Sequence, residues 1–136
     1  MRDSRHIYIP GQPVGKGRPR FVKATGHTYT PTKTKDYESL VKRAYIIDNG
    51  HTMLTGPIRL DIFAVYQLPK DKKRRAILAQ RPYTGKPDID NVAKVIQDAL
   101  NGLAYEDDKQ VVEMYVEKRY CGEDEEPHVS VTVREI

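Results

Sequence analysis

An amphipathic segment from Lys86 to Gln110, KPDIDNVAKVIQDALNGLAYEDDKQ, limits the possible folds of this chain more than any other stretch. At 100° per residue, its apolar and polar residues fall on opposite sides of a helix. The apolar side holds Ile89, Val92, Ile96, Ala99, Leu100 and Leu103, and the polar side holds Asp90, Asn91, Lys94, Gln97, Asp98 and Asn101. Such a helix is stable where its apolar side packs on another layer, so the chain has to supply that layer.

The rest of the sequence predicts a sheet for this purpose. Alternating apolar residues predict strands over 6–14, 56–69, 110–120 and 127–136. Helical spacing predicts a helix over 33–50, ended by Gly50, and a short basic helix over 70–80. Gly, Pro, Thr and basic residues predict a loop over 15–33.

The predicted order of elements is βαβααββ, without repeats or linkers. The last two strands are close enough in sequence to form a hairpin, which favours a mixed sheet. We therefore predict an α/β fold (α+β, with helices packed on a mixed sheet) as a single domain over residues 1–136. The Tyr-containing strand over 110–120 fits either a strand with one buried face or a strand that buries against a partner.

Composition excludes several other classes of protein. No apolar run approaches the ~20 residues that a membrane-spanning helix needs, and the N-terminus lacks the apolar core of a secretory signal. The one cysteine, Cys121, has no partner for an internal disulfide and no nearby ligands for zinc. The four histidines are scattered, and no P-loop, CxxC or GxSxG motif is present. These features favour a reducing, cytoplasmic location.

Charge is distributed unevenly along the chain. Up to Lys86 there are 18 Lys and Arg against 6 Asp and Glu, and from Pro87 onward there are 5 against 13, for a net charge of +4. Two basic clusters are candidates for DNA phosphate contacts; they comprise Lys16, Arg18 and Arg20 in GKGRPRF, and Lys72, Lys73, Arg74 and Arg75 in KDKKRR, with Lys86 as a further candidate. The alternative is that these charges are solvated surface. The acidic GEDEEP segment, 122–127, is expected to lie away from DNA.

Carboxylates bracket the amphipathic helix. Asp88 and Asp90 stand two residues apart at its start, where extended backbone would point both side chains the same way. Helix capping is the alternative role for one of them. Asp107 and Asp108 follow the helix, where negative charge is mildly unfavourable and capping gives no reason for them. If the strands on either side are neighbours, Asp88, Asp90 and Asp108 meet at one end of the sheet.

Clustered carboxylates repel each other unless a cation lies between them. Oxygen ligands alone suit Mg²⁺ or Mn²⁺. The calcium loop of EF-hands is excluded, because Val92 and Ala93 stand where its further ligands belong. Lys94, one turn after Asp90, fits either a surface ion pair or a group that offsets charge on a reacting phosphate.

The run KPDIDNVAKVIQDALNG, followed by YEDDKQVV and supported by GKGRPRF and YTP upstream, resembles the RusA family of Holliday-junction resolvases. The resemblance implies a homodimeric endodeoxyribonuclease that uses Mg²⁺ to cut four-way DNA junctions by paired, symmetric nicks in recombination and repair. It implies that Asp88, Asp90 and Asp108 are the essential metal-binding aspartates, that Lys94 is the essential lysine, and that Asp107 is an additional candidate ligand.

The residues alone reach only as far as metal-dependent chemistry on phosphates. Two other hypotheses are therefore kept: a non-catalytic DNA-binding protein, and a metal-dependent nuclease for other branched DNA or for RNA. Divalent metal separates them, because a binding protein needs none.

Overall fold

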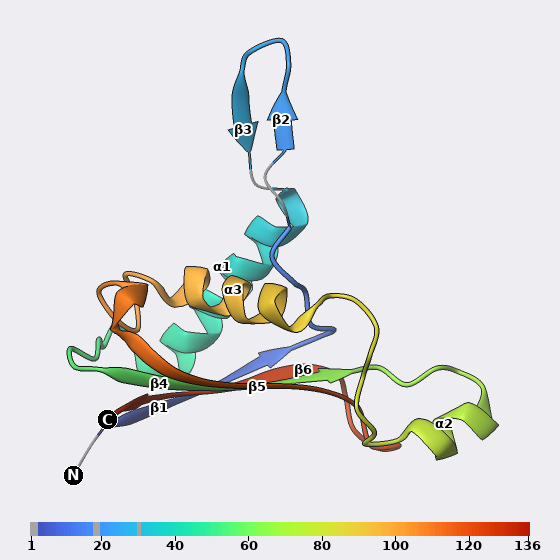
Figure 1. Cartoon of the computed structure of the whole chain (residues 1–136). Helices are drawn as coiled ribbons and strands as arrows, with labels where there is room; N and C mark the ends of the chain where they lie inside the picture. The colour runs from blue at the N-terminus through green and yellow to red at the C-terminus, as the bar shows by residue number, and fades with distance from the viewer. Residues whose placement is uncertain (1–2, 18–19, 30) are drawn as a thin grey trace.

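Four strands form a mixed sheet with the order β1-β6-β4-β5 (Figure 1). They are β1 (Ser4–Pro10), β4 (Ile58–Tyr66), β5 (Val111–Tyr120) and β6 (His128–Glu135). β4 pairs parallel with β5 and antiparallel with β6, and β1 pairs antiparallel with β6. The computed structural model describes residues 3–17, 20–29 and 31–136.

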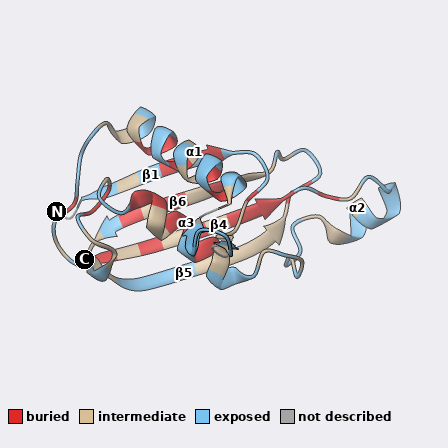
Figure 2. Cartoon of the chain, turned by 90° about the horizontal axis from the view of Figure 1, so that it is seen from above, coloured by how far each residue is buried: buried red, intermediate tan, exposed pale blue. Residues whose placement is uncertain are grey.

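Two helices cover one face of this sheet. α1 (Thr32–Asn49) packs on β1 and against α3 (Ile89–Leu100), which also contacts β5 (Figure 2). The predicted inward residues of β4, from Ile58 to Tyr66, are buried beneath the helices. Of the predicted apolar side of α3, Val92, Ile96, Ala99 and Leu100 are buried, whereas Ile89 is 48% exposed at the first turn. The predicted α/β class, α+β with helices on a mixed sheet, is confirmed.

The predicted hairpin of the last two strands is wrong. β4 lies between β5 and β6, so the segment 121–127 crosses the end of β4 instead of making a tight turn. Cys121 N donates to Tyr66 O at 2.8 Å as the chain makes this crossing. The even-numbered residues of β4 are buried under the helices. β4 lies inside the sheet, where a partner strand on each side satisfies the hydrogen-bonding groups of its backbone.

A second sheet was missed in the region expected to be a loop. β2 (Arg20–Val22) and β3 (His27–Tyr29) form a small antiparallel hairpin that projects from the helix-covered side of the molecule (Figure 1). Gly26, at φ 70°, donates to Val22 O at 2.8 Å and closes the turn. The signal was present as two short β-branched and aromatic runs around a Gly-containing turn, FVKATGHTY.

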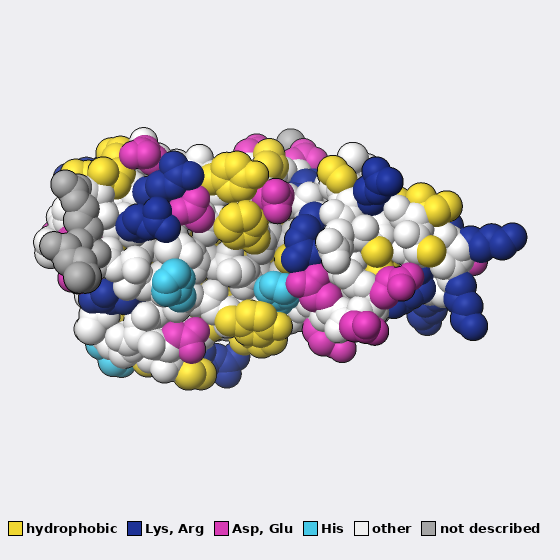
Figure 3. Space-filling model, turned by 90° about the horizontal axis from the view of Figure 1, so that it is seen from below, with side chains coloured by type: hydrophobic (Ala, Val, Ile, Leu, Met, Phe, Trp, Pro, Cys, Tyr) yellow, Lys and Arg dark blue, Asp and Glu magenta, His cyan; other side chains and the backbone are white. Residues whose placement is uncertain are grey.

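No helix formed by the described residues covers the other face of the main sheet. Figure 3 shows hydrophobic, histidine and charged side chains intermixed on it. Tyr8 stacks on His128 with ring centroids 4.9 Å apart, and Phe63 packs against Tyr115 at 5.7 Å. Aromatic pairs of this kind cover part of an exposed sheet surface without building a second core.

The outer backbone groups of the two edge strands, β1 and β5, are hydrogen-bonded to different extents. On β1, His6 O accepts a hydrogen bond from Asn49 Nδ2 at 3.0 Å, and Tyr8 N donates to Asp48 Oδ2 at 3.3 Å. Side chains at the end of α1 thus occupy backbone groups of that edge. On β5, Tyr83 N donates to Lys118 O at 3.1 Å and Tyr120 N donates to Arg81 O at 2.8 Å, so the segment 81–83 covers only the last part of the strand.

Candidate active site

Asp88 and Asp90 lie exposed at the start of α3. Asp88 occupies the N-cap position with extended backbone, but its side chain makes no capping hydrogen bond, and Asp90 follows in the first turn. Among the described residues, neither carboxylate takes part in an ion pair. Capping, the alternative role considered above, therefore does not use these carboxylates, and both are available to a ligand.

Lys118 of β5 holds the loop that carries Asp88. Its Nζ donates to Gly85 O and to Pro87 O, each at 2.7 Å, and lies 5.4 Å from the ring centre of Tyr83. Tyr83 stacks on Tyr66 at 3.9 Å, and its hydroxyl donates to Lys86 O at 3.0 Å. Charge-assisted hydrogen bonds to two carbonyls on either side of a turn restrict its backbone strongly. The loop 83–88 is therefore fixed by β5 and not merely by its ends.

The segment before β2 packs against the same loop. Gly15 lies so close to Pro87 that a Cβ at this position would overlap the proline ring. Lys16 N donates to Asn91 O at 2.9 Å, which joins the segment to the first turn of α3. The absence of a side chain at Gly15 thus permits a close approach beside Asp88.

A groove of about 920 Å³ lies next to Asp88. Its walls come from residues 12–17, from the start of α1, and from residues 86–91. Lys33 and Lys86 line it with exposed side chains, and the buried hydroxyl of Tyr66 has no hydrogen-bond partner among the described residues. A groove with Lys33, Lys86 and the carboxylate of Asp88 on its walls suits a polyanionic ligand that approaches together with a cation.

Lys16 connects the elements beneath this groove. Its Nζ lies 2.9 Å from Glu38 Oε2 on α1 and 3.0 Å from Asp98 Oδ2 on α3. Burial acts to lower the pKa of Lys16, but the hydrogen bonds to Glu38 and Asp98 outweigh it, and the pKa is raised. Its ammonium is thus charged and occupied by two carboxylates, which makes it a structural link between helices in this conformation.

Lys94 also pairs with Asp98. Its Nζ lies 3.7 Å from Asp98 Oδ2, and the side chain is 61% exposed. The ion pair expected as the alternative role for Lys94 is therefore made with the following turn of α3 and not with Asp90. An exposed pair of this kind is weak, about 0.3–0.5 kcal/mol, so the contact with Asp98 restrains Lys94 only slightly.

The two acidic residues after α3 have different surroundings. Asp107 caps the short 3-10 helix η1 (Asp108–Gln110), accepting a hydrogen bond from Lys109 N at 3.1 Å. Gln110 completes the turn by accepting from Asp107 N at 3.1 Å while its amide donates to Leu54 O and Gly56 O. Asp107 is therefore engaged in local structure, and the carboxylate of Asp108 has no such role.

The pKa values of the same two carboxyl groups are shifted in opposite directions. The hydrogen bond from Lys109 N, followed by that with Asp108, lowers the pKa of Asp107. The hydrogen bond to Asp107, burial and the nearby negative charges of Asp107 and Asp98 raise the pKa of Asp108, against the opposing effect of Lys94. Adjacent carboxylates of this kind favour a cation near Asp108.

The three predicted metal ligands do not form one cluster within the chain. Asp88 lies beside the end of β5, where Lys118 holds its loop, whereas Asp108 precedes the start of β5 and lies near Asp98 and Lys94. Residues 3–17, 20–29 and 31–136 contain no group of three acidic, His or Cys side chains close enough to hold a metal ion. Asp88 and Asp90 are together, and Asp107 and Asp108 are together, but the two pairs are separate.

The remaining predicted DNA contacts are divided between two places. Lys72, Lys73 and Arg74 are exposed on α2 (Lys72–Leu78), which extends beyond the end of the sheet (Figure 1). Arg75 instead donates to Pro69 O and Glu123 O. Arg18 lies outside the described residues, and only the backbone of Arg20 is described, in β2.

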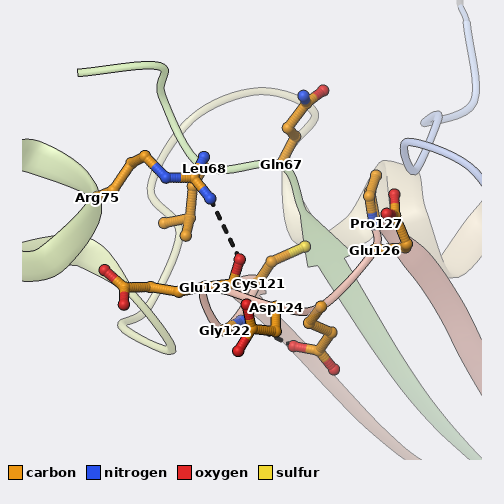
Figure 4. Close-up of a pocket in the computed structure, with 10 residues that line it drawn as sticks. Gln67, Leu68, Arg75, Cys121, Gly122, Glu123, Asp124, Glu126 and Pro127 are labelled. Carbon is orange, nitrogen blue, oxygen red and sulfur yellow. Dashed lines mark hydrogen bonds between the residues drawn. The ribbon is translucent and has the colours of Figure 1, made fainter. Parts of the chain in front are cut away.

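A second cavity, of about 380 Å³, lies where 121–127 crosses the sheet. Figure 4 shows Arg75 reaching across to the main-chain oxygen of Glu123, in the segment that also carries Cys121 and several acidic side chains. Burial raises the pKa of that thiol. None of the predicted catalytic residues lines this cavity.

Comparison with known proteins agrees with the motif. The family model described as Endodeoxyribonuclease RusA matches residues 10–134. This chain belongs to the RusA endodeoxyribonuclease family. It is also similar to the uncharacterized protein YqaN of Bacillus subtilis (strain 168), at 38% identity over 136 residues, which covers 94% of each chain. The RusA match includes both acidic pairs, both basic clusters and the residues that hold them.

Some residues around the RusA motif were not found from the sequence. Lys118 was assigned only to an alternating strand, and Lys33 only to the start of a helix. Lys118 could not be recognised because its contacts are with Gly85 and Pro87, more than 30 positions earlier in the sequence. Lys33 could not be recognised because the groove that it lines forms only in the folded chain. Gln110 was quoted within the motif, and its two hydrogen bonds to the 54–56 segment account for its presence.

No helix in the described part of the chain has the length and hydropathy to cross a bilayer.

Proposed function

We propose that this protein is a Mg²⁺-dependent endodeoxyribonuclease that resolves four-way (Holliday) DNA junctions by paired, symmetric phosphodiester cleavage in recombination and repair. The observation that carries the proposal is the uncapped pair Asp88 and Asp90 beside a groove lined by Lys33 and Lys86, in a chain of the RusA family. The family supplies the junction as substrate, and the site supplies the chemistry.

The donor set fits a hard divalent cation. Asp88, Asp90 and Asp108 would hold Mg²⁺, or Mn²⁺ in its place, through carboxylate oxygens alone. Such a cation, when bound, would supply positive charge that polarises the scissile phosphate and favours loss of a proton from the attacking water. Asp107 is not proposed as a ligand, since its carboxylate already caps η1.

The other residues bind and orient the DNA. Lys94 offsets negative charge that develops on the scissile phosphate, because its exposed ammonium is held only weakly by Asp98. Lys33 and Lys86 contact phosphates along the groove. The exposed cations of α2, Lys72, Lys73 and Arg74, contact DNA further from the cut. Lys16 acts indirectly, by joining α1 to α3.

The test is Asp90→Asn, measured with synthetic junction, duplex and single-stranded DNA, with and without magnesium. Cleavage of the junction should fall by at least about 10²-fold, while junction binding is kept or tightened because a negative charge near phosphate is lost. Asp124→Asn removes one exposed negative charge elsewhere and should cleave like the wild type.

Each alternative gives its own result. Cleavage by Asp90→Asn at the wild-type rate in magnesium would falsify the assignment of the site. Junction binding without cleavage by the wild type in either metal would favour a DNA-binding protein. Preferred cleavage of flaps, other branched DNA or RNA would keep the metal site and change the substrate.

A further inference from the structure

Tyr66, the last residue of β4, carries a hydroxyl that the chain itself does not use. The side chain is fully buried, and its hydroxyl has no hydrogen-bond partner among the described residues. Its ring is fixed by stacking on Tyr83, with centroids 3.9 Å apart and planes only 8° from parallel. Buried polar groups are nearly always hydrogen-bonded in proteins, so a hydroxyl left free marks a place where a ligand can supply the missing acceptor.

A second tyrosine has the same property at the same place. Tyr37 of α1 is 6% exposed, and its hydroxyl also lacks a partner among the described residues. Burial, followed by the nearby Tyr66 oxygen, raises the pKa of Tyr37 against the smaller opposing effect of the Val14 N–H. Burial, followed by Tyr83, raises the pKa of Tyr66. Both phenols therefore keep their protons at neutral pH, and each offers an O–H donor.

Tyr66 belongs to the wall of the groove beside Asp88. This groove, of about 920 Å³, is also lined by Pro13, Val14, Pro31 and Pro87. Its volume falls within the range of about 300–1,000 Å³ that is typical of small-molecule sites. Like those sites, it combines mostly apolar walls with a few polar groups that have no other partner.

These walls favour a neutral, flat group over a phosphate. A phosphate placed against proline rings and neutral phenols would lose its hydration with little compensation for its charge. A nucleobase instead has apolar faces for the rings, and carbonyl oxygens and ring nitrogens that accept from an O–H. The exposed side chains of Lys33 and Lys86 line the same groove and suit the phosphates on either side of such a base.

Only an unstacked nucleotide can offer its base in this way. Within a paired duplex the base faces are covered by their neighbours, and extrusion costs free energy that is smallest for a base already unpaired. A branch point interrupts stacking and pairing, so it supplies such a nucleotide more readily than an intact duplex does. A groove of this kind therefore favours branched DNA without any contact to a fourth arm.

We propose that the groove beside Asp88 receives one unstacked nucleobase of the DNA, and that the Tyr66 hydroxyl donates a hydrogen bond to an acceptor on that base. The inference rests on the function proposed above for the presence of DNA at Asp88. It makes Tyr66 a residue that selects the nucleotide near the cut, and Tyr37 a second donor at the same place.

The first test is Tyr66→Phe, which keeps the ring stacked on Tyr83 and removes only the hydroxyl. Without magnesium, so that no DNA is cut, it should bind a synthetic junction about fivefold more weakly than the wild type. Its urea midpoint of unfolding should be unchanged or higher, because the hydroxyl has no partner in the free protein. The matched control is Tyr8→Phe, which removes a hydroxyl from a 51% exposed side chain outside the groove and should bind like the wild type.

The second test locates the base that Tyr66 contacts. Junctions carrying one abasic nucleotide, moved stepwise along the strand around the cut, are bound by the wild type and by Tyr66→Phe. At one position the abasic junction should bind equally to the two proteins, because the acceptor has been removed from the DNA as the donor was from the protein. At the other positions the fivefold difference should persist. Junctions with one methylphosphonate remove a phosphate charge instead, and they should preserve the difference at every position.

The outcomes separate this inference from the proposed function. A wild type that cuts junctions, with Tyr66→Phe binding every DNA equally well, rejects the base subsite and keeps the nuclease. A difference abolished by a methylphosphonate, and by no abasic nucleotide, shows a phosphate contact and overturns the proposal. A lowered urea midpoint with the same loss of binding for every junction shows a structural role and also overturns it. A wild type that does not cut, with equal binding at one abasic position, rejects the nuclease and keeps the subsite.

Discussion

The two edges of the sheet show how similar strands receive different treatment. At β1, Asp48 and Asn49 from the end of α1 bond to the backbone of Tyr8 and His6. At β5, the segment 81–83 covers the end of the strand, and no other described residue bonds to the outer backbone groups of 111–117. An edge occupied by the chain's own side chains is stabilised within the fold, whereas an open apolar edge leaves backbone groups accessible to water or to another strand.

The largest effect within one chain is expected at the covered end of β5. Lys118→Met removes two charge-assisted hydrogen bonds that hold the Asp88 loop, each worth about 1.5–3 kcal/mol. We expect kcat on junction DNA to fall by at least about tenfold with little change in KM, and the Mg²⁺ concentration for half-maximal activity to rise. Lys118→Arg should recover part of the loss, and the exposed α1 variant Lys42→Met should have no effect. An unchanged magnesium dependence in Lys118→Met would contradict a positioning role.

A smaller effect is expected at the closed edge. The double variant Asp48→Ala, Asn49→Ala removes the contacts to Tyr8 N and His6 O, and both groups then bond to water. The free energy of unfolding should fall by about 1 kcal/mol, measured by urea denaturation, with nuclease activity unchanged. Light scattering should show new concentration-dependent association, because a second edge has been opened. A variant that stays monodisperse and equally stable would remove the contrast between the two edges.

The smallest effect concerns the segment that keeps β5 at the edge. Glu125 accepts hydrogen bonds from Arg119 and from Gly122 N, and the Arg119 bond, as the main cause, lowers the pKa of Glu125 from 4.5 to about 2. The stabilisation is present above pH 4.5 and is lost as the pH falls toward 2. Since the pair is partly exposed, Glu125→Gln should cost less than about 1 kcal/mol at neutral pH. Between those pH values the melting temperature of Glu125→Gln should fall less than that of the wild type. An equal fall in both proteins would show that the ion pair of Glu125 with Arg119 does not contribute to the pH dependence.

Periodicity made parts of the fold predictable. α3 and β4 each bury one face, and their patterns of 3.6 and 2 residues appear directly in the sequence. The pairing of β5 was not predictable in this way. The short separation of β5 and β6 in sequence favoured a hairpin between them. In the structure both strands pair with β4 instead, and this arrangement depends on how all four strands fit together.

The candidate site was predictable to a similar extent. The sequence indicated a metal site formed by carboxylates, from the spacing of Asp88 and Asp90 and from the adjacent Asp107 and Asp108. The sequence did not separate Asp107 from Asp108, because the difference arises from a backbone N–H at Lys109. It also did not show that the two pairs stand apart, since helix direction relative to β5 fixes that distance.

The position of β6 has a consequence for how the chain folds during synthesis. β6 is the last strand in sequence, yet it lies between β1, the first, and β4. During synthesis, β1 and β4 therefore have no shared partner until residues 128–135 emerge from the ribosome. Contacts between the two ends of a chain form slowly and late. Asp88, Asp90 and Asp108, the aspartates proposed as catalytic, are thus translated before the sheet that positions them is complete, so C-terminally truncated chains should be unable to nick DNA.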